Sequence, residues 1–411
     1  MIDIKLIREN IEKVKGGVSK KGYPTDVVDR VAELDKKRLE VLQKVEELRH
    51  ERNLVAKEQN IERGREIKEE LKKLEPELES AESEVNVLLS EIPNLPQDSV
   101  PKGEGENDNV TLREWGTIKE FGFTPLDHVE LGKALDILDF DNGAKVSGSD
   151  FYYLKNDGVL LELALAQYGI KFLTDRGFTP FLTPDLARER YYLGTGYLPK
   201  GDEAQTYKIE GTDLGLIATA EVTLAGYHAD EVLNEKDLPK MYAGYSHCFR
   251  MESGAYGKYS KGLYRVHQFS KVEMFIFAKP EESQKIHEKL LALEEEFWQS
   301  LEIPYRVVEM CTGDLGAQAS RKFDIEAWMP GRGDYGEVTS TSNTTDYQAR
   351  NLNIRYRKGS ETQYVHTLNG TLFAASRCPI AILENYQQED GSVEIPSVLR
   401  SYMGKDKIAT S

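Results

Sequence analysis

Residues 247–277 read HCFRMESGAYGKYSKGLYRVHQFSKVEMFIF, and this stretch has the pattern of two strands joined by a hairpin. Its middle is rich in glycine and lysine, which is typical of a loop. Arg250 and Glu252 are two residues apart, so on a strand their side chains would project from one face of a rigid sheet. A guanidinium there can hold a phosphate through two parallel hydrogen bonds, although a lone Arg-x-Glu is more often an ordinary cross-strand ion pair.

A second stretch, residues 364–387, reads YVHTLNGTLFAASRCPIAILENYQ and predicts a strand ending at Asn369, then a helix that carries Arg377. An arginine among apolar residues is costly to bury unless it is paired, so Arg377 either meets an anion or keeps its charged end in water. The sequence contains neither a GxxxxGK[ST] phosphate-binding loop nor a dinucleotide fingerprint. Any nucleotide must therefore be held by other groups.

In the N-terminal part of the chain, apolar residues recur at alternating spacings of three and four over residues 26–59 and again over residues 67–92. This pattern predicts two amphipathic helices that pair as an antiparallel coiled-coil arm, about residues 26–91, with a turn at residues 60–64. Pro76 lies inside the second stripe and predicts a kink or a late helix start, because proline lacks the backbone N–H and its ring clashes with the preceding turn.

Basic residues gather around the turn of this arm, whereas glutamates crowd the returning helix. A heptad stripe by itself usually means dimerisation or core packing, but a basic tip on a solvated arm suits a phosphate backbone. The candidate RNA-binding residues are Lys57, Arg63, Arg65, Lys68, Lys72 and Lys73.

Residues 92–109, IPNLPQDSVPKGEGENDN, hold three prolines and cannot continue a helix, so they predict a linker. Beyond it, strand-like runs such as residues 272–278 and 305–310 alternate with helical patterns such as residues 159–176 and 280–301. We therefore expect an α+β protein of two domains, residues 1–100 with the arm and residues 101–411 with the chemistry.

The chain has 411 residues, with 53 Lys plus Arg against 70 Asp plus Glu, and a net charge of −17. The most apolar stretch, residues 159–166, is far shorter than the roughly 20 residues that cross a bilayer. The N-terminus lacks the apolar core of a signal peptide, so we expect a cytoplasmic protein without a membrane span. Cys248, Cys311 and Cys378 lie far apart, which predicts reduced, buried thiols rather than a disulfide framework or a zinc site.

Together these segments resemble the seryl-tRNA synthetases, a family of class II aminoacyl-tRNA synthetases, over essentially the whole chain. FRMES and GLYRVHQFSKVE are similar to motif 2 (about residues 245–277), HTLNGT and AILENYQ to motif 3 (about 364–388), and RGFTPFLTPDL to motif 1 (about 170–190). Further similar stretches are GTGYLP, TAEV, CTGDLG and EVTSTSN, which begin at Gly194, Thr219, Cys311 and Glu337. The resemblance implies a catalytic domain built on an antiparallel sheet flanked by helices, preceded by a tRNA-binding arm.

The resemblance also implies an activity. Such an enzyme activates L-serine with ATP to seryl-adenylate and pyrophosphate, then transfers serine to the 3′ end of tRNA(Ser), with tRNA(Sec) as a second candidate substrate. Motif 1 implies a homodimer. Two alternatives stay open: a synthetase-like paralogue that activates a small amino acid for a carrier other than tRNA, and a non-catalytic protein built on the coiled coil. The paralogues usually lack the arm, and the non-catalytic protein predicts that the arginine and glutamate set has decayed.

Site residues follow from the same resemblance, position by position. Arg250 and Arg377 are the implied catalytic residues, which would hold the α-phosphate and the γ-phosphate. The oxygen atoms of Glu337 and Ser340 are the hard ligands that Mg²⁺ prefers. The implied ATP-binding residues are Arg250, Met251, Glu252, Val266, Glu337, Val338, Thr339, Ser340 and Arg377, and the implied serine-binding residues are Thr219, Ala220, Glu221, Arg250, Glu273 and Thr371.

Several positions depart from the family's usual pattern. Met251 stands where a small residue is usual, and Asp150 where an arginine is common. Phe373 and Pro379 replace a smaller, proline-free stretch, so we expect them to reshape the adenylate pocket or to kink its helix. We also expect Phe373 to help Thr371 crowd out threonine.

Overall fold

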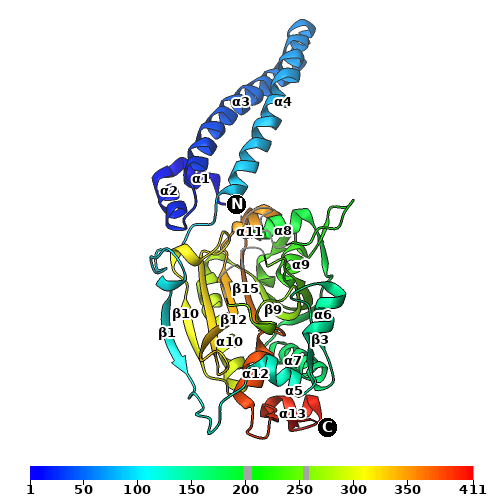
Figure 1. The fold of residues 1–411 in the computed structure, drawn as a ribbon. Helices are drawn as coiled ribbons and strands as arrows, with labels where there is room; N and C mark the ends of the chain where they lie inside the picture. The colour runs from blue at the N-terminus through cyan, green and yellow to red at the C-terminus, as the bar shows by residue number, and fades with distance from the viewer. Residues whose placement is uncertain (198–205, 253–258, 411) are drawn as a thin grey trace. The chain divides into compact units, whose positions relative to one another are not determined.

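The computed structural model describes residues 1–197, 206–252 and 259–410, which form two compact units, Met1–Pro96 and a second that begins at Gln97. The first unit contains α1 (Ile4–Glu9), α2 (Ile11–Lys20), α3 (Asp26–Lys57) and α4 (Ile61–Glu91). The two long helices lie side by side as an antiparallel hairpin (Figure 1). The predicted arm is therefore confirmed.

Apolar side chains form the seam of this hairpin, among them Val45, Leu48, Ile67 and Leu71. Arg38 falls on the same stripe, and its charge is met by the buried Asp35, which also binds Arg8. The seam thus follows the heptad pattern, and the charge of Arg38 on it is paired.

The turn of the arm differs from the expectation. It covers residues 58–60 rather than 60–64, because the Asn60 side chain accepts a hydrogen bond from the Arg63 backbone N–H (3.2 Å) and starts α4 at Ile61. The expected late start at Pro76 is also wrong, since α4 runs through this residue. Leu71 and Leu78 are buried on either side of the exposed Pro76, so tertiary packing keeps the helix continuous.

The second unit is built on an eight-stranded sheet with the order β1-β10-β11-β12-β15-β9-β8-β4. All neighbours are antiparallel except β4 and β8. The strands in that order are β1 (Val110–Trp115), β10 (Tyr305–Glu309), β11 (Arg321–Met329), β12 (Asp334–Asn343), β15 (His366–Ala374), β9 (Gln268–Ala278), β8 (Lys240–Phe249) and β4 (Thr179–Leu182). The expectation of an antiparallel sheet flanked by helices is confirmed.

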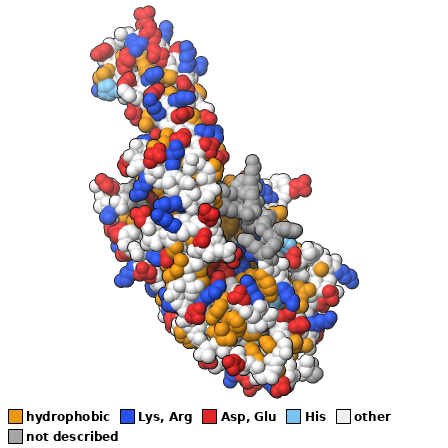
Figure 2. Space-filling view, turned by 60° about the vertical axis from the view of Figure 1, so that its left-hand side comes forward, with side chains coloured by type: hydrophobic (Ala, Val, Ile, Leu, Met, Phe, Trp, Pro, Cys, Tyr) orange, Lys and Arg blue, Asp and Glu red, His pale blue; other side chains and the backbone are white. Residues whose placement is uncertain are grey.

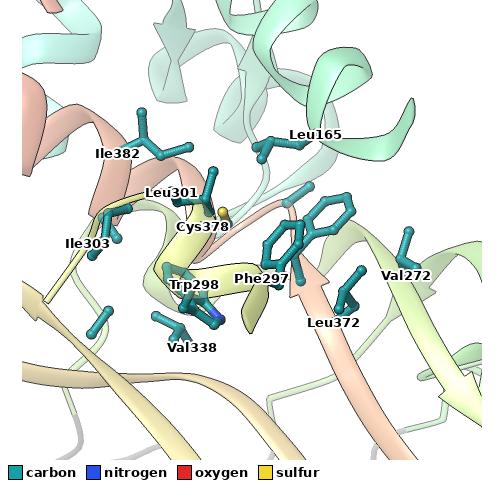
Figure 3. Close-up of a cluster of buried hydrophobic side chains, with 14 of the residues drawn as sticks. Leu165, Val272, Phe297, Trp298, Leu301, Ile303, Val338, Leu372, Cys378 and Ile382 are labelled. Carbon is teal, nitrogen blue, oxygen red and sulfur yellow. The ribbon is translucent and has the colours of Figure 1, made fainter. Parts of the chain in front are cut away.

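Helices cover both faces of this sheet. On one face, α7 (Asp157–Thr174) packs against β8 and β9, α10 (Ser283–Ser300) against β12 and β15, and α12 (Cys378–Tyr386) against β11. Phe297 and Trp298 of α10 meet Leu165, Leu372 and Cys378 there (Figure 3). Phe275 and Phe277 point to the other face, where α9 (Ala220–Gly226) and α11 (Tyr347–Leu352) lie.

This alternation along β9 determines which side chains reach the functional site. Val272, Met274 and Ile276 belong to the core on the α7 and α10 face. Lys271 and Glu273 share the opposite face with the two phenylalanines, because successive strand residues point to opposite sides. The sheet thereby carries a charged pair on a strand that is otherwise buried.

The expectation that Phe373 shapes the pocket is wrong. Its side chain is fully buried in the core and stacks on Phe297, with ring centroids 6.0 Å apart. Gly169 of α7 makes room for it, since a Cβ at that glycine would lie 3.0 Å from the Phe373 ring. Phe373 therefore stabilises the packing of α7 and α10 and does not crowd a substrate.

Pro379 does not kink its helix either. It lies in the first turn of α12, where a backbone N–H has no intrahelical partner in any case. The three cysteines are free and buried, as expected. Within the described ranges, no helix is long and apolar enough to cross a membrane.

Candidate active site

A cavity of about 480 Å³ opens beside β8, β9, β12 and β15. Among the described residues that line it, five carry positive charge and four carry carboxylates, so the cavity is strongly polar. The cations are Arg250, Arg265, Lys271, Lys322 and Arg377, and the carboxylates are Glu221, Glu252, Glu273 and Glu337. Such a lining suits a ligand that carries both phosphates and a zwitterionic group.

Arg250 and Glu252 both line the cavity, but not from the regular strand that was expected. β8 ends at Phe249, and Glu252 has a positive φ of 50°. The guanidinium of Arg250 lies over the ring of Phe269, 5.2 Å from its centroid, and Nε donates to the carbonyl of Ala218 (3.4 Å). Glu252 accepts a hydrogen bond from Arg265 Nη1 (3.0 Å). Both side chains share one side, as predicted, but they reach the cavity from the segment after β8, where Glu252 is left-handed, and not from a regular strand.

Arg377 lies directly before α12, and its guanidinium reaches across to β12. Nη1 donates to the Glu337 carbonyl (3.0 Å) and lies 3.1 Å from Glu337 Oε2, and the group stacks over Tyr264. Burial opposes ionisation of Glu337, but the charges of Arg377 and Lys322 outweigh it and lower the pKa of Glu337 to about 2. The carboxylate is therefore ionised over the whole physiological range.

A bulge in β12 brings Glu337 and Ser340 to the same side. The pairing with β11 runs from Thr339 opposite Ile325 directly to Glu337 opposite Glu326, which leaves Val338 as the extra residue. Residues three apart would otherwise point to opposite faces of a strand. Ser340 lies opposite Asp324, whose buried carboxyl is 3.3 Å from Lys322 Nζ.

The other end of the cavity holds Glu221, Glu273 and Thr371. Thr371 lies opposite Glu273 in the pairing of β15 with β9, and its hydroxyl donates to Glu273 Oε2 (3.3 Å). Lys271 forms an ion pair with Glu273 and lies 3.3 Å from Thr371 Oγ1. Burial and the charge of Glu273 raise the pKa of Glu221 to about 7, although Gln348 and Lys271 oppose the shift.

Three predicted residues are not part of the described lining. Thr219 caps α9, where its hydroxyl accepts from the Glu221 N–H (3.2 Å). Ala220 is fully buried against Gly244, and Met251 is 45% exposed. Thr219 and Ala220 therefore position Glu221 rather than face the cavity. The remaining predicted residues, Val266, Val338 and Thr339, do line it.

Lys271 and Asn369 line the cavity and Gln348 contacts its wall residue Glu221, but none of the three was predicted as a site residue. Lys271 could have been found, because it alternates with Glu273 on a predicted strand. Gln348 and Asn369 carried no local signal, since their relation to Glu221 depends on elements distant in the sequence. The last two residues of GTGYLP and residues 253–258 of motif 2 lie outside the described residues.

The basic residues of the arm divide into two groups. Arg63 is engaged by Glu51, Glu66 and Glu70, at 2.7, 3.0 and 3.5 Å. The other predicted residues are exposed and make no ion pair with any described residue: Lys57, Arg65, Lys68, Lys72 and Lys73. The visible surface of the arm shows positive and negative side chains interspersed (Figure 2).

Comparison with known families places the chain among synthetases. The "Seryl-tRNA synthetase N-terminal domain" model matches residues 1–96, and the "tRNA synthetase class II core domain (G, H, P, S and T)" model matches residues 206–386. A serine–tRNA ligase of Dictyoglomus thermophilum is 54% identical, over 99% of both chains.

Solved structures agree with these matches over the full length. The seryl-tRNA synthetase of Pyrococcus horikoshii complexed with ATP superimposes with a TM-score of 0.94 at 45% identity, covering 100% of both chains. The cytoplasmic serine–tRNA ligase of Naegleria fowleri in complex with AMP gives 0.90 at 36% identity, covering 100% of this chain and 99% of that one.

Proposed function

Because the chain belongs to the seryl-tRNA synthetase family, we propose that its charged cavity is where serine and ATP react. The protein is a serine–tRNA ligase with a class II catalytic core, and ATP is its substrate. The alternative of a paralogue that loads another carrier has no support, since the relatives match over the arm as well as the core. The non-catalytic alternative predicted a decayed arginine and glutamate set, and all three of Arg250, Glu337 and Arg377 line the cavity.

One observation carries the proposal, which is that two groups of residues line a single cavity. Arg250 and Arg377 are suited to bind phosphate. Glu221, Glu273 and Thr371 are suited to bind an amino acid. Carboxylates match an ammonium group, and the pair of Glu273 and Thr371 matches a hydroxyl. The two reactants would thus be held side by side, which removes much of the entropic cost of their reaction.

In the proposed reaction, a carboxylate oxygen of serine attacks the α-phosphorus of ATP. The new carboxyl–phosphate bond forms as the bond from the α-phosphorus to the bridging oxygen breaks, and pyrophosphate leaves. Arg250 stabilises the negative charge that develops on the α-phosphoryl oxygens, and Arg377 holds the γ-phosphate. A hydroxyl at the 3′ end of tRNA then attacks the carbonyl carbon, and AMP leaves. No nucleophile from the protein is needed.

Magnesium fits the oxygen atoms present on β12. The Glu337 carboxylate and the Ser340 hydroxyl share one face because of the bulge, and hard oxygen ligands are what Mg²⁺ prefers. Two protein ligands are few for an all-protein cage but usual for Mg²⁺, which takes its other ligands from phosphates and water. When bound there, the ion would supply positive charge to the phosphates.

We propose that the exposed lysines of the arm contact tRNA(Ser), and tRNA(Sec) is a second candidate for the same charging assay. Among the described residues of the arm, Arg65, Lys68, Lys72 and Lys73 have no carboxylate partner, so their charges remain available to a phosphate backbone. Arg63 contributes less, because three glutamates already surround it. From this role in translation we infer a cytoplasmic protein.

A homodimer is proposed from the surface of the motif 1 region. Leu160 and Leu163 of α7 are 41% and 50% exposed, and Leu182 of β4 is 81% exposed. Because α7 packs against β4, we infer that these side chains form one apolar patch, and such a patch is typical of a protein interface. In sedimentation, we expect a species twice the monomer mass of 46.6 kDa, and monomers alone at micromolar concentration would contradict the dimer.

The test of the whole proposal is pyrophosphate exchange with each amino acid in turn. We expect exchange with L-serine and ATP, and no comparable exchange with the others. Strong exchange with a different amino acid would contradict the assignment of the cavity. Charging of tRNA(Ser) with labelled serine then tests the second step.

A further inference from the structure

Gln348, in the first turn of α11, is fully buried and directly contacts a wall residue of the cavity. Its amide nitrogen donates to Glu221 Oε1 (2.6 Å) and to the carbonyl of Thr195 (3.0 Å). Its amide oxygen accepts from the hydroxyl of Thr367 (2.9 Å). The side chain therefore connects α8 (Glu189–Thr195), α9, α11 and β15 through a single amide.

The chemistry of these partners fixes the orientation of the amide. A backbone carbonyl and a carboxylate accept hydrogen bonds, so both require the NH₂ group. The Thr367 hydroxyl donates, so it requires the oxygen. A rotation of the amide by 180° would place oxygen against the Glu221 carboxylate and leave buried groups unpaired. Gln348 thus presents a donor to Glu221 in one defined direction.

We propose that Gln348 is a positioning residue for amino-acid recognition, which holds Glu221 as a carboxylate directed into the cavity to receive the ammonium group of serine. The inference rests on the proposed function, in which Glu221 faces serine. It assigns a role in substrate binding to a residue that does not itself line the cavity.

The surroundings of Glu221 show why a donor matters at this place. Glu221 is 3% exposed, and the like charge of Glu273 on β9 faces it. Burial and this charge raise the pKa of Glu221 to about 7, while the hydrogen bonds from Gln348 and Asn369 and the charge of Lys271 lower it. Tyr197 also lines the cavity, and burial and the charge of Glu221 raise the pKa of that tyrosine well above its usual value. Without Gln348, the pKa of Glu221 would rise further, so Glu221 would be mainly protonated at neutral pH and would lose its attraction for an ammonium group.

A purely structural role is the alternative, since Gln348 also connects helices. Asn351 provides the matched control, because it lies on the same helix and donates to the carbonyl of Gly194 (2.9 Å). Asn351→Ala removes a connection between α11 and α8 without touching Glu221. If Gln348 only braced the helices, variants at the two positions would behave alike.

The experiment measures KM for serine and for ATP by pyrophosphate exchange between about pH 6 and pH 8.5, a range in which a group with a pKa near 7 titrates. In Gln348→Met, we expect the KM for serine to rise about tenfold or more at neutral pH, as for loss of a hydrogen bond to a charged group. The KM should recover as the pH rises and Glu221 ionises. The KM for ATP should stay unchanged.

A second variant tests whether the charge at position 348 controls the ionisation of Glu221. Gln348→Glu keeps the shape of the side chain, but it places a second carboxyl against Glu221. Its serine KM should recover only at a higher pH than that of Gln348→Met, because repulsion between the two carboxyl groups raises the pKa of Glu221 further. Asn351→Ala, in which Glu221 keeps its hydrogen bond from Gln348, should follow the pH profile of the wild type.

Two results would overturn the inference. One is a serine KM in both Gln348 variants that equals that of the wild type. The other is a change that is independent of pH and matched by Asn351→Ala. Glu221→Gln separates the two levels: if it raises the serine KM while the Gln348 variants do not, only this inference fails, and if it leaves the KM unchanged, the assignment of Glu221 in the proposed function fails too.

Discussion

Arg377 and Glu337 form an ion pair across the cavity, with Nη1 3.1 Å from Oε2 and a second hydrogen bond from Nη1 to the Glu337 carbonyl. Both were expected to serve ATP, one at the γ-phosphate and the other at magnesium. In the structure the two side chains contact each other. In the proposed function, contacts with phosphate and magnesium would replace this ion pair, so that both charges stay compensated.

The pair gives a prediction for stability. Arg377→Ala should destabilise the fold at neutral pH, and a double-mutant cycle with Glu337→Gln should give a coupling of about 1 kcal/mol. We expect a small coupling free energy because the Glu337 side chain is 38% exposed, so water screens the ion pair. The pKa of Glu337 lies below its usual value, so the coupling should be present above about pH 4.5 and decline as the pH falls through about 2. Chemical unfolding at several pH values measures it, and a coupling that persists at low pH would contradict the prediction.

Arg250→Ala should abolish adenylate formation. The loss of one preorganised positive group from a developing oxyanion costs about 2.7 to 4 kcal/mol, or roughly 10²- to 10³-fold in kcat. Pyrophosphate exchange measures the effect, and an unchanged unfolding midpoint shows that the fold is intact. Arg250→Lys is the matched control, which keeps the charge but loses the planar fork, so it should retain only part of the activity. Near-normal exchange in Arg250→Ala would remove this residue from the mechanism.

Replacement of Lys68, Lys72 and Lys73 by glutamate should weaken tRNA binding and flatten its salt dependence, because each lost phosphate contact removes roughly one unit of salt slope. Serine activation should survive. Arg63→Gln is the control, because Glu51, Glu66 and Glu70 already compensate that charge, and we expect it to change the slope less. If charging at about 150 mM salt is unchanged in the triple variant, the arm's lysines are only a solvated surface.

Thr371→Ala should weaken serine binding and reduce the enzyme's discrimination between serine and alanine. A site that hydrogen-bonds a hydroxyl rejects an analogue without it by about 10⁴-fold, because the buried partners are left unpaired. Thr371 donates to Glu273 and lies beside Lys271, so its loss disturbs the group expected to hold that hydroxyl. The ratio of the pyrophosphate-exchange rates with serine and with alanine measures this discrimination. Unaltered discrimination would mean that Thr371 does not face the substrate.

His287 gives a prediction for the pH dependence of stability. Burial lowers its pKa from 6.5 to about 4, although its ring nitrogen Nε2 donates to the Thr341 carbonyl (3.2 Å). The unfolded chain binds the proton more readily than the folded chain does. The contribution of neutral His287 to the free energy of unfolding is therefore complete above about pH 6.5 and is lost as the pH falls to about 4. The pKa difference between the two states corresponds to about 3 kcal/mol. In His287→Gln, the free energy of unfolding should fall less between these pH values than in the wild type. An identical decline in both proteins would contradict the prediction.

Elements with a strong local period could be predicted from the sequence alone. The heptad stripes gave the arm, and the prolines of residues 92–109 gave the end of α4 at Glu91. The strand patterns placed β9 and β10, and the motifs selected Arg250, Glu337 and Arg377 before any contact was known. These predictions succeed because the periods of helices and strands appear in the spacing of apolar residues close together in the sequence.

The way in which these residues act together depends on tertiary contacts that the sequence pattern does not reveal. The bulge at Val338 puts Glu337 and Ser340 on one face, and Phe373 packs into the core rather than the cavity. Gln348 reaches Glu221 across 127 positions of the chain. Such contacts depend on sheet order, strand register and helix packing. These join segments that are distant in the sequence, and the local pattern of one segment does not predict its contacts with another.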